Sequence, residues 1–223
     1  MTHDTSAHRP AIAASGRLTR RQATAGLAAL PLALTPALGW AQAAGDAAGA
    51  AMEVSGVRFE PTASVAGKTL KLNGAGTRYK LVFKVYAAGL YLSQPARTTE
   101  AVLAAPGPKR LLVSMLREID ANELGKLFVK GMSENATREE NMKAIGGTLK
   151  MGELFAARKR LKVGESFSVD YLPGTGTTIL INDRQEFGPV AEPEFFSALI
   201  KIWLGNAPAD FKLKEALLGV GAR

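Results

Sequence analysis

Two side chains in the stretch GTRYKLVFKVYAAGLYLS, residues 76–93, are of types that bind small ligands: Arg78 and Tyr86. An arginine guanidinium presents paired N–H donors that match a carboxylate, and a tyrosine hydroxyl adds a further donor. Residues of alternating polarity along this stretch predict one long β-strand, with an apolar core face and with Arg78 and Tyr86 together on the other face. This second face is therefore our first candidate for a binding site.

The spacing between the two side chains argues against a joint site. Along one straight strand, Arg78 and Tyr86 would stand about 26 Å apart, at roughly 3.3 Å per residue. The residues between them include no turn-forming type, and a bulge could bend this segment without reversing it. We therefore expect the two side chains to be too far apart to hold the same head group.

The residue types that are missing exclude several kinds of chemistry. The chain has no cysteine, and its two histidines, His3 and His8, lie in an N-terminal segment that we expect to be removed. This composition excludes Cys/His zinc sites, histidine bases and cysteine nucleophiles from the remainder of the chain. No acidic cluster has the spacing of a metal-binding loop. Gly74 and Gly76 lack the third glycine and the following helix of a dinucleotide fingerprint, so we expect neither a metal nor a cofactor.

Residues 1–43 have the pattern of a cleavable export signal. A basic start that includes Arg20 and Arg21 precedes an Ala/Leu-rich stretch, and the triplet AQA at 41–43 fits a cleavage site after Ala43. The pattern predicts export to the periplasm by the general secretory or the twin-arginine route. An uncleaved membrane helix is the alternative, which two prolines and two glycines within the Ala/Leu-rich stretch disfavour. No later segment is apolar for long enough to span a bilayer, so no stable span is expected after signal removal.

The net charge of +8 does not indicate a nucleic-acid partner. The first 43 residues carry four arginines and one aspartate, which leaves +5 for the remaining residues. These charges are spread along the chain, and the densest run, RKRLK at 158–162, is typical of a solvated helix end.

The elements that must position Arg78 and Tyr86 follow from periodicity and capping signals. Residues 44–52 are predicted to be a flexible leader, and residues 53–223 a single domain. The first part of the domain should contain short strands over 54–72, the long strand over 76–93, a short helix capped by Thr98 or Thr99, and a strand over 109–117. A helix capped by Asp120 should follow, with Leu124, Leu127 and Phe128 on one face, and then a helical region over 137–161 interrupted at Gly146-Gly147. The last part should contain a hairpin after Gly164, an amphipathic helix over 192–205 and a final helix after Asp210. This order predicts an α+β fold with helices on one face of an antiparallel sheet.

Two long blocks of the sequence resemble a known family. LNGAGTRYKLVFKVYAAGLYL and YLPGTGTTILINDRQEFGPVAEPEFFSALIKIWLGNAPADFKLKEALLG are similar to the chalcone isomerase-like family, specifically its exported bacterial branch, and the resemblance covers roughly residues 53–219. It implies an open-faced β-sandwich, in which a large antiparallel sheet carries a layer of helices on one face and a ligand cleft lies between them. The family contains isomerases that cyclise a chalcone to a flavanone, members that bind fatty acids and members with no assigned activity.

The resemblance also implies where a site would lie. Arg78 falls where the isomerases have the arginine that polarises the substrate. The other polar positions of the isomerases are not matched here, because they align with Tyr86, Leu124, Leu127, Gly131 and Ile202. Cyclisation needs several donors for the developing enolate oxygen, and the loss of one such donor typically costs about 10²- to 10³-fold in rate. These substitutions disfavour isomerase chemistry.

Three functions therefore remain open on the sequence alone. The first is a non-catalytic periplasmic protein that binds a small amphiphile such as a fatty acid through Arg78 and Tyr86, as the fatty-acid-binding relatives use an Arg/Tyr pair. The predicted cleft lining comprises Leu124, Leu127, Gly131, Ile202 and Trp203. The second is an intramolecular lyase or isomerase of a phenolic enone, with Arg78 as the catalytic residue. The third is a structural or partner-binding envelope protein without a small ligand.

Overall fold

The computed structural model describes residues 50–220, and its centre is a seven-stranded antiparallel sheet. The predicted export signal, its cleavage site and most of the predicted leader lie outside the described residues. The order of the strands across the sheet is β11-β10-β9-β6-β5-β4-β3. Their bounds are Thr62–Val65 for β3, Lys68–Lys80 for β4, Phe83–Leu92 for β5, Lys109–Met115 for β6, Ser166–Leu172 for β9, Gly176–Ile181 for β10 and Arg184–Val190 for β11.

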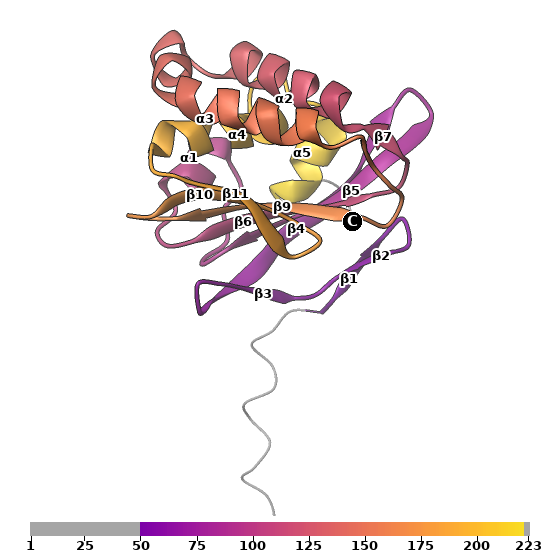
Figure 1. The fold of residues 1–223 in the computed structure, drawn as a ribbon. Helices are drawn as coiled ribbons and strands as arrows, with labels where there is room; N and C mark the ends of the chain where they lie inside the picture. The colour runs from indigo at the N-terminus through magenta and orange to yellow at the C-terminus, as the bar shows by residue number, and fades with distance from the viewer. Residues whose placement is uncertain (1–49, 221–223) are drawn as a thin grey trace, which may run out of the picture. The chain divides into compact units, whose positions relative to one another are not determined.

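The helices lie on one side of this sheet (Figure 1). They are α1 (Thr99–Ala104), α2 (Ala121–Asn135), α3 (Arg138–Ala157), α4 (Pro193–Leu204) and α5 (Phe211–Leu217). The predicted caps are present at two of them, since the side chains of Thr98 and Asp120 accept backbone N–H bonds at the starts of α1 and α2. The short strands β7 (Ile119–Asp120) and β8 (Arg160–Leu161) pair beside this layer. The structure thus has the predicted α+β architecture, and its curled sheet forms an open half-barrel.

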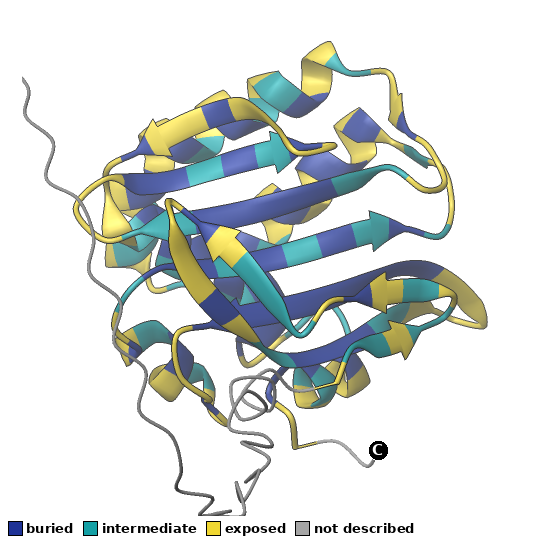
Figure 2. Cartoon of the chain, turned by 90° about the horizontal axis from the view of Figure 1, so that it is seen from below, coloured by how far each residue is buried: buried dark blue, intermediate teal, exposed yellow. Residues whose placement is uncertain are grey.

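A small ribbon covers part of the opposite face of the sheet. It consists of β1 (Met52–Val54) and β2 (Val57–Phe59), and Figure 2 shows it crossing the central strands, which are largely buried. Phe59 packs so closely on β5 that a Cβ atom at Gly89 would stand 2.6 Å from its ring. Residues 85–92 are consequently buried on both faces of the sheet, so the expectation of a single core face along this strand is wrong.

The stretch 76–93 is not one strand. It forms the end of β4, a two-residue turn at Leu81 and Val82, and β5, which runs antiparallel to β4. The turn was missed because neither residue is a usual turn former, although Leu81 adopts a φ of +57°. Because the chain reverses here, the 26 Å separation expected for Arg78 and Tyr86 is wrong.

The predicted interruption at Gly146-Gly147 is also absent, because α3 runs unbroken through both glycines. Gly147 is instead a point of close packing, where a Cβ atom would stand 2.6 Å from the ring of Phe195 on α4 and 2.9 Å from Val190 on β11. The helix begins with a complete capping box between Thr137 and Glu140.

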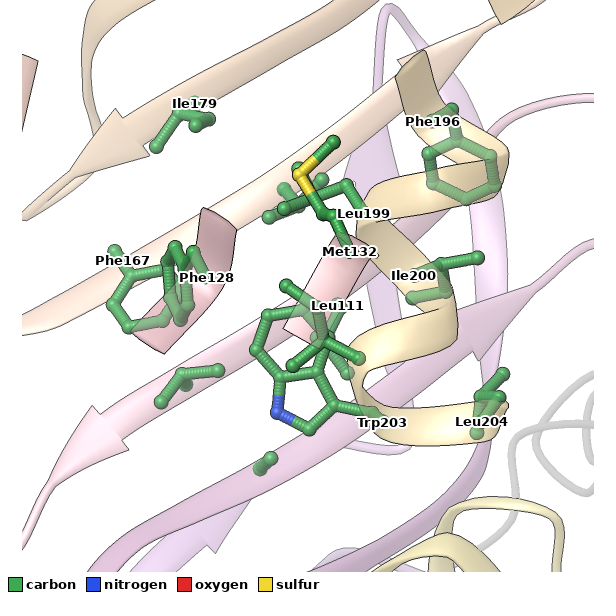
Figure 3. Packing of buried hydrophobic residues seen from close by; sticks show 14 of the residues in the cluster. Leu111, Phe128, Met132, Phe167, Ile179, Phe196, Leu199, Ile200, Trp203 and Leu204 are labelled. Carbon is green, nitrogen blue, oxygen red and sulfur yellow. The ribbon is translucent and has the colours of Figure 1, made fainter. Parts of the chain in front are cut away.

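The main core fills the space between the sheet and the helices. Figure 3 shows Trp203 of α4 and Phe128 of α2 among aliphatic side chains that include Leu111 of the sheet. The Phe128 ring makes edge contacts with Phe155, Phe167 and Trp203, at centroid distances of 5.3–5.7 Å. Among residues 50–220, no helix has the length and apolarity that a membrane span requires.

Candidate functional site

A cavity of about 160 Å³ opens between the β4–β5 hairpin and the helices α2 and α4. Most of its wall is hydrocarbon, and its polar groups come from both strands and from one turn of α2. The lining residues are Arg78, Tyr86, Leu124, Leu127, Phe128, Lys130, Gly131, Glu134, Ile202 and the segment Ala207–Ala209. We call this space the Arg78 cavity.

The cavity brings together six of the seven residues that were expected at a site. Arg78, Tyr86, Leu124, Leu127, Gly131 and Ile202 all line it. The seventh, Trp203, lies behind the wall, where it is 1% exposed and contacts Tyr86. Sequence reasoning missed Lys130 and Glu134, which a helical wheel would have placed on the same side of α2 as Leu127. It also missed the loop from Ala207 to Ala209, for which the sequence carries no positional signal.

Arg78 and Tyr86 are direct cross-strand partners in the β4–β5 ladder. The Cζ atom of Arg78 lies 5.5 Å from the centroid of the Tyr86 ring, within the range of a cation–π contact. A register shift directly after this pair, between Arg78 and Tyr79, leaves the hairpin irregular at that point. The pair that sequence spacing separated is therefore one unit at the wall of the cavity.

Tyr86 is almost fully buried, and its hydroxyl oxygen accepts a hydrogen bond of 2.8 Å from Trp203 Nε1. Burial raises the pKa of Tyr86 to about 12, while the charge of Arg78 and the bond from Trp203 act in the opposite direction. The phenol is accordingly neutral at ordinary pH. Within residues 50–220 the hydroxyl proton has no acceptor.

Arg78 is half-buried, and its Nε is fully shielded from solvent without a hydrogen-bond partner in the described part of the chain. Nor does its guanidinium form an ion pair with any carboxylate in that part. The carboxylate of Asp210 accepts the backbone N–H groups of Tyr79 and Leu213 instead. A buried N–H without a partner costs roughly 1–3 kcal/mol.

The charges on α2 at the cavity largely cancel. Lys130 and Glu134 are exposed and form an i,i+4 ion pair of 3.6 Å. The aliphatic wall behind them is tightly packed, since a Cβ atom at Gly131 would stand 3.1 Å from Cγ1 of Ile202. Leu127 is 39% exposed and provides an apolar surface that solvent reaches. The cavity wall is thus mostly apolar, and Arg78 is the cation on it that forms no ion pair within residues 50–220.

Metal chemistry finds no support in the described residues. Nowhere in residues 50–220 do three acidic, histidine or cysteine side chains gather closely enough to hold a metal ion. The polar groups of the Arg78 cavity include a single carboxylate, Glu134, which is already paired with Lys130.

Comparison with known proteins gives a family and a fold. A family model described as chalcone isomerase-like matches residues 51–219. A crystal structure of a fatty-acid-binding protein from Arabidopsis thaliana superposes with a TM-score of 0.58, covers 73% of this chain and 92% of its own, and is 15% identical in sequence. At this identity the likeness shows the fold alone. No curated protein sequence matches the chain significantly.

Proposed function

We propose a non-catalytic, ligand-binding role for this chain, which belongs to the chalcone isomerase-like family. The ligand is a small amphiphile with an anionic head group and an apolar tail, such as a fatty acid. The head group binds at Arg78 and Tyr86, and the first carbons of the tail occupy the apolar part of the Arg78 cavity.

One observation carries this proposal, namely that Arg78, whose guanidinium forms no ion pair within residues 50–220, lines a mostly apolar cavity. A carboxylate accepts two parallel N–H bonds from a guanidinium, and the neutral Tyr86 hydroxyl can donate a third bond to the same group. The structural likeness to a fatty-acid-binding protein agrees with this ligand class. A fully satisfied arginine at this position would have left the proposal without support.

The lining of the cavity favours binding over isomerisation. Cyclisation of a phenolic enone needs an oriented phenolate and donors aimed at the enolate oxygen. The positions that aligned with polar isomerase residues carry Leu124, Leu127, Gly131 and Ile202, which present hydrocarbon or no side chain to the cavity. Arg78 and Tyr86 alone would have to supply the catalytic effect. Incubation with a hydroxychalcone should therefore yield flavanone only at the spontaneous rate, and production well above that rate would favour the isomerase.

The size of the cavity restricts the ligand further. A volume of about 160 Å³ is below the roughly 300–1,000 Å³ of typical small-molecule pockets. It accommodates a carboxylate and several carbons, and a longer tail would extend past the exposed side chain of Leu127. We expect affinity to rise from butyrate to about octanoate and to change little from octanoate to palmitate.

Trp203 fluorescence provides the binding assay, because its indole N–H bonds the Tyr86 hydroxyl. The assay uses a Trp40→Phe background, in which Trp203 is the only tryptophan. Octanoate should change the emission saturably, and Arg78→Ala should weaken the affinity about tenfold or more, since hydrogen bonds to charged groups contribute roughly 1.5–3 kcal/mol. Arg58→Ala is the matched control, because Arg58 pairs with Glu60 outside the cavity. A flat titration at every chain length would reject the ligand and favour a structural or partner-binding role.

We also propose that the protein is an exported member of its family and that it acts in the periplasm. Residues 1–43 support this through their basic start, their apolar stretch and the AQA triplet. Protein purified from a periplasmic extract should begin at Ala44 by N-terminal sequencing, and a mature chain that still contains residues 1–43 would reject cleavage. Mass spectrometry of lipids that co-purify with this protein, compared with Arg78→Ala, would identify the natural ligand.

A further inference from the structure

The tip of the β4–β5 hairpin is an exposed apolar turn between two lysines. Leu81 and Val82 are 89% and 81% exposed, and Phe83 is 52% exposed. Lys80 and Lys84 flank these three residues and are also exposed. We call residues 80–84 the hairpin tip. A hairpin that served only the fold would place polar residues at such a position.

The turn itself is chemically unusual. Lys80 pairs with Phe83, so the loop consists of Leu81 and Val82 alone. Two-residue hairpin loops favour glycine and asparagine because they require positive φ angles, and Leu81 has a φ of +57°. A leucine in this conformation is strained relative to asparagine or glycine. The fold therefore gains nothing from an apolar turn here, and the reason for it must lie outside the fold.

A third cation stands beside the two lysines. The Cζ atom of Arg117 lies 4.4 Å from the centroid of the Phe83 ring. Glu118, which follows Arg117 in the sequence, pairs with Arg160 at 2.8 Å. Asp210 reaches the neighbouring Tyr79, where its carboxylate accepts the backbone N–H groups of Tyr79 and Leu213. The hairpin tip has no acidic residue of its own. It consequently presents apolar side chains at the centre and positive charge around them.

This pattern matches the surface of an anionic bilayer. Apolar and aromatic side chains at an interface bury themselves below the lipid head groups, and lysine and arginine interact with the phosphates. A second exposed apolar surface, formed by Met142, Ile145 and Leu149 on α3, has a mixed charge instead: the exposed Arg138 and Lys150 lie on the same helix as the exposed Glu139 and Glu153. Its neighbouring Lys143 is bound by two carboxylates, at 2.9 and 3.1 Å.

We propose that the hairpin tip docks this chain onto an anionic lipid bilayer, with Leu81 and Val82 inserted below the head groups. Lys80, Lys84 and Arg117 then lie at the level of the phosphates. The Arg78–Tyr86 pair is three residues from the turn along β4, about 10 Å at strand spacing. Docking in this way places the Arg78 cavity close to the bilayer, in which amphiphiles reside. The docking itself does not depend on any ligand in that cavity.

The absence of cysteine from the sequence makes a site-specific test possible. An environment-sensitive fluorophore is attached to the full chain through Val82→Cys, and in a second sample through Leu149→Cys on α3. Vesicles of phosphatidylglycerol and phosphatidylcholine should shift the emission at position 82 to the blue, and a nitroxide-labelled lipid should quench it. The label at position 149, which replaces a 62% exposed leucine, should not respond. Because the readout is local, insertion of residues 1–43 cannot imitate the result, and vesicles without fatty acid keep it independent of the cavity.

Further variants test the chemistry of docking, and the quantity measured is the fraction of protein labelled at position 82 that binds vesicles. Lys80→Gln and Lys84→Gln should each weaken partitioning into vesicles about fivefold. Leu81→Asn should weaken it about tenfold, because the inserted leucine is lost, while the turn keeps a residue suited to its φ angle. Met142→Gln is the matched control on α3 and should change nothing. An unresponsive label at position 82, an equal response to phosphatidylcholine alone, or a blue shift that follows protein concentration without vesicles would each overturn the proposal; the last result would indicate self-association instead.

Discussion

Two cations stand over tyrosine rings on the helix-covered face of the same sheet, and only one of them lines a cavity. Arg78 lies over Tyr86 at 5.5 Å, and Lys109 lies over Tyr171 at 5.1 Å. Lys109 is the cross-strand partner of Leu92, six residues along β5 from Tyr86. The first pair thus joins β4 to β5, and the second joins β6 to β9 beside the other end of β5; they share a face and a kind of contact.

The pairs differ in whether the hydrogen bonds of the cation are satisfied. Lys109 is 3% exposed, and its Nζ donates to the carbonyl oxygens of Ala105 at 2.6 Å and Gly107 at 3.4 Å. A second ring, Phe196, stacks on Tyr171 and closes the surroundings. Arg78 instead has a shielded Nε without a partner among residues 50–220, and the residue lines the Arg78 cavity. A cation–π contact alone therefore does not identify a binding site, and the proposal for Arg78 rests instead on its place at the wall of a cavity without an ion pair.

Alkaline pH should separate the two pairs most strongly. Burial raises the pKa of Tyr86 from 10.0 to about 12, so its contribution to stability is complete below pH 10 and is lost as the pH rises toward 12. A shift of this size corresponds to about 3 kcal/mol. Urea unfolding should show wild type losing up to that amount between pH 10 and 12 relative to Tyr86→Phe. Parallel pH profiles for the two proteins would mean that Tyr86 is not buried as a neutral phenol.

The Lys109 pair should respond to pH in the opposite direction. Burial lowers the pKa of Lys109 below its ordinary value of 10.5, so the unfolded chain binds more protons at this group than the folded chain does. Stability from this group therefore increases as the pH rises through the lowered pKa toward 10.5. Relative to Lys109→Met, wild type should gain free energy of unfolding in that window.

Substitution by methionine is the second way to test the comparison. Lys109→Met should lower the free energy of unfolding by about 2 kcal/mol at neutral pH, because the carbonyl oxygens of Ala105 and Gly107 lose their buried donor. Octanoate affinity, measured by Trp203 fluorescence, should stay within twofold of wild type. Unchanged stability together with weakened octanoate binding would show that the two pairs had been assigned the wrong roles.

The sequence predicted the parts of this fold that depend on local signals. The caps at Thr98 and Asp120, the order of the helices along the chain, and the end of α4 at Gly205 are all confirmed. They could be predicted because capping, amphipathic periodicity and glycine at a helix end act within a few residues.

The errors arose where tertiary structure overrides a local preference. Leu81 and Val82 have the polarity of a strand, yet they form the turn that brings Arg78 opposite Tyr86. Gly147 has the preference of a helix breaker, yet α3 continues through it. The ring of Phe195 occupies the space that a side chain at position 147 would fill, so this glycine serves close packing. At the candidate site, the resemblance predicted the residues on the strands and helices, whereas Ala207–Ala209 are in a loop that only the folded chain places at the cavity.

Arg78→Met is the counterpart of the substitution at Lys109 and should have the opposite sign. Methionine keeps the apolar stem and removes a shielded N–H group that has no partner in the described structure, so the free energy of unfolding should rise by about 0.5–1 kcal/mol. Octanoate binding should be lost in the same variant. When a polar group is kept for function rather than for folding, we expect it to destabilise the ligand-free protein. Urea unfolding of the two variants, measured side by side, decides between these outcomes. If Arg78→Met lowered the free energy of unfolding as Lys109→Met does, the guanidinium would have a structural role.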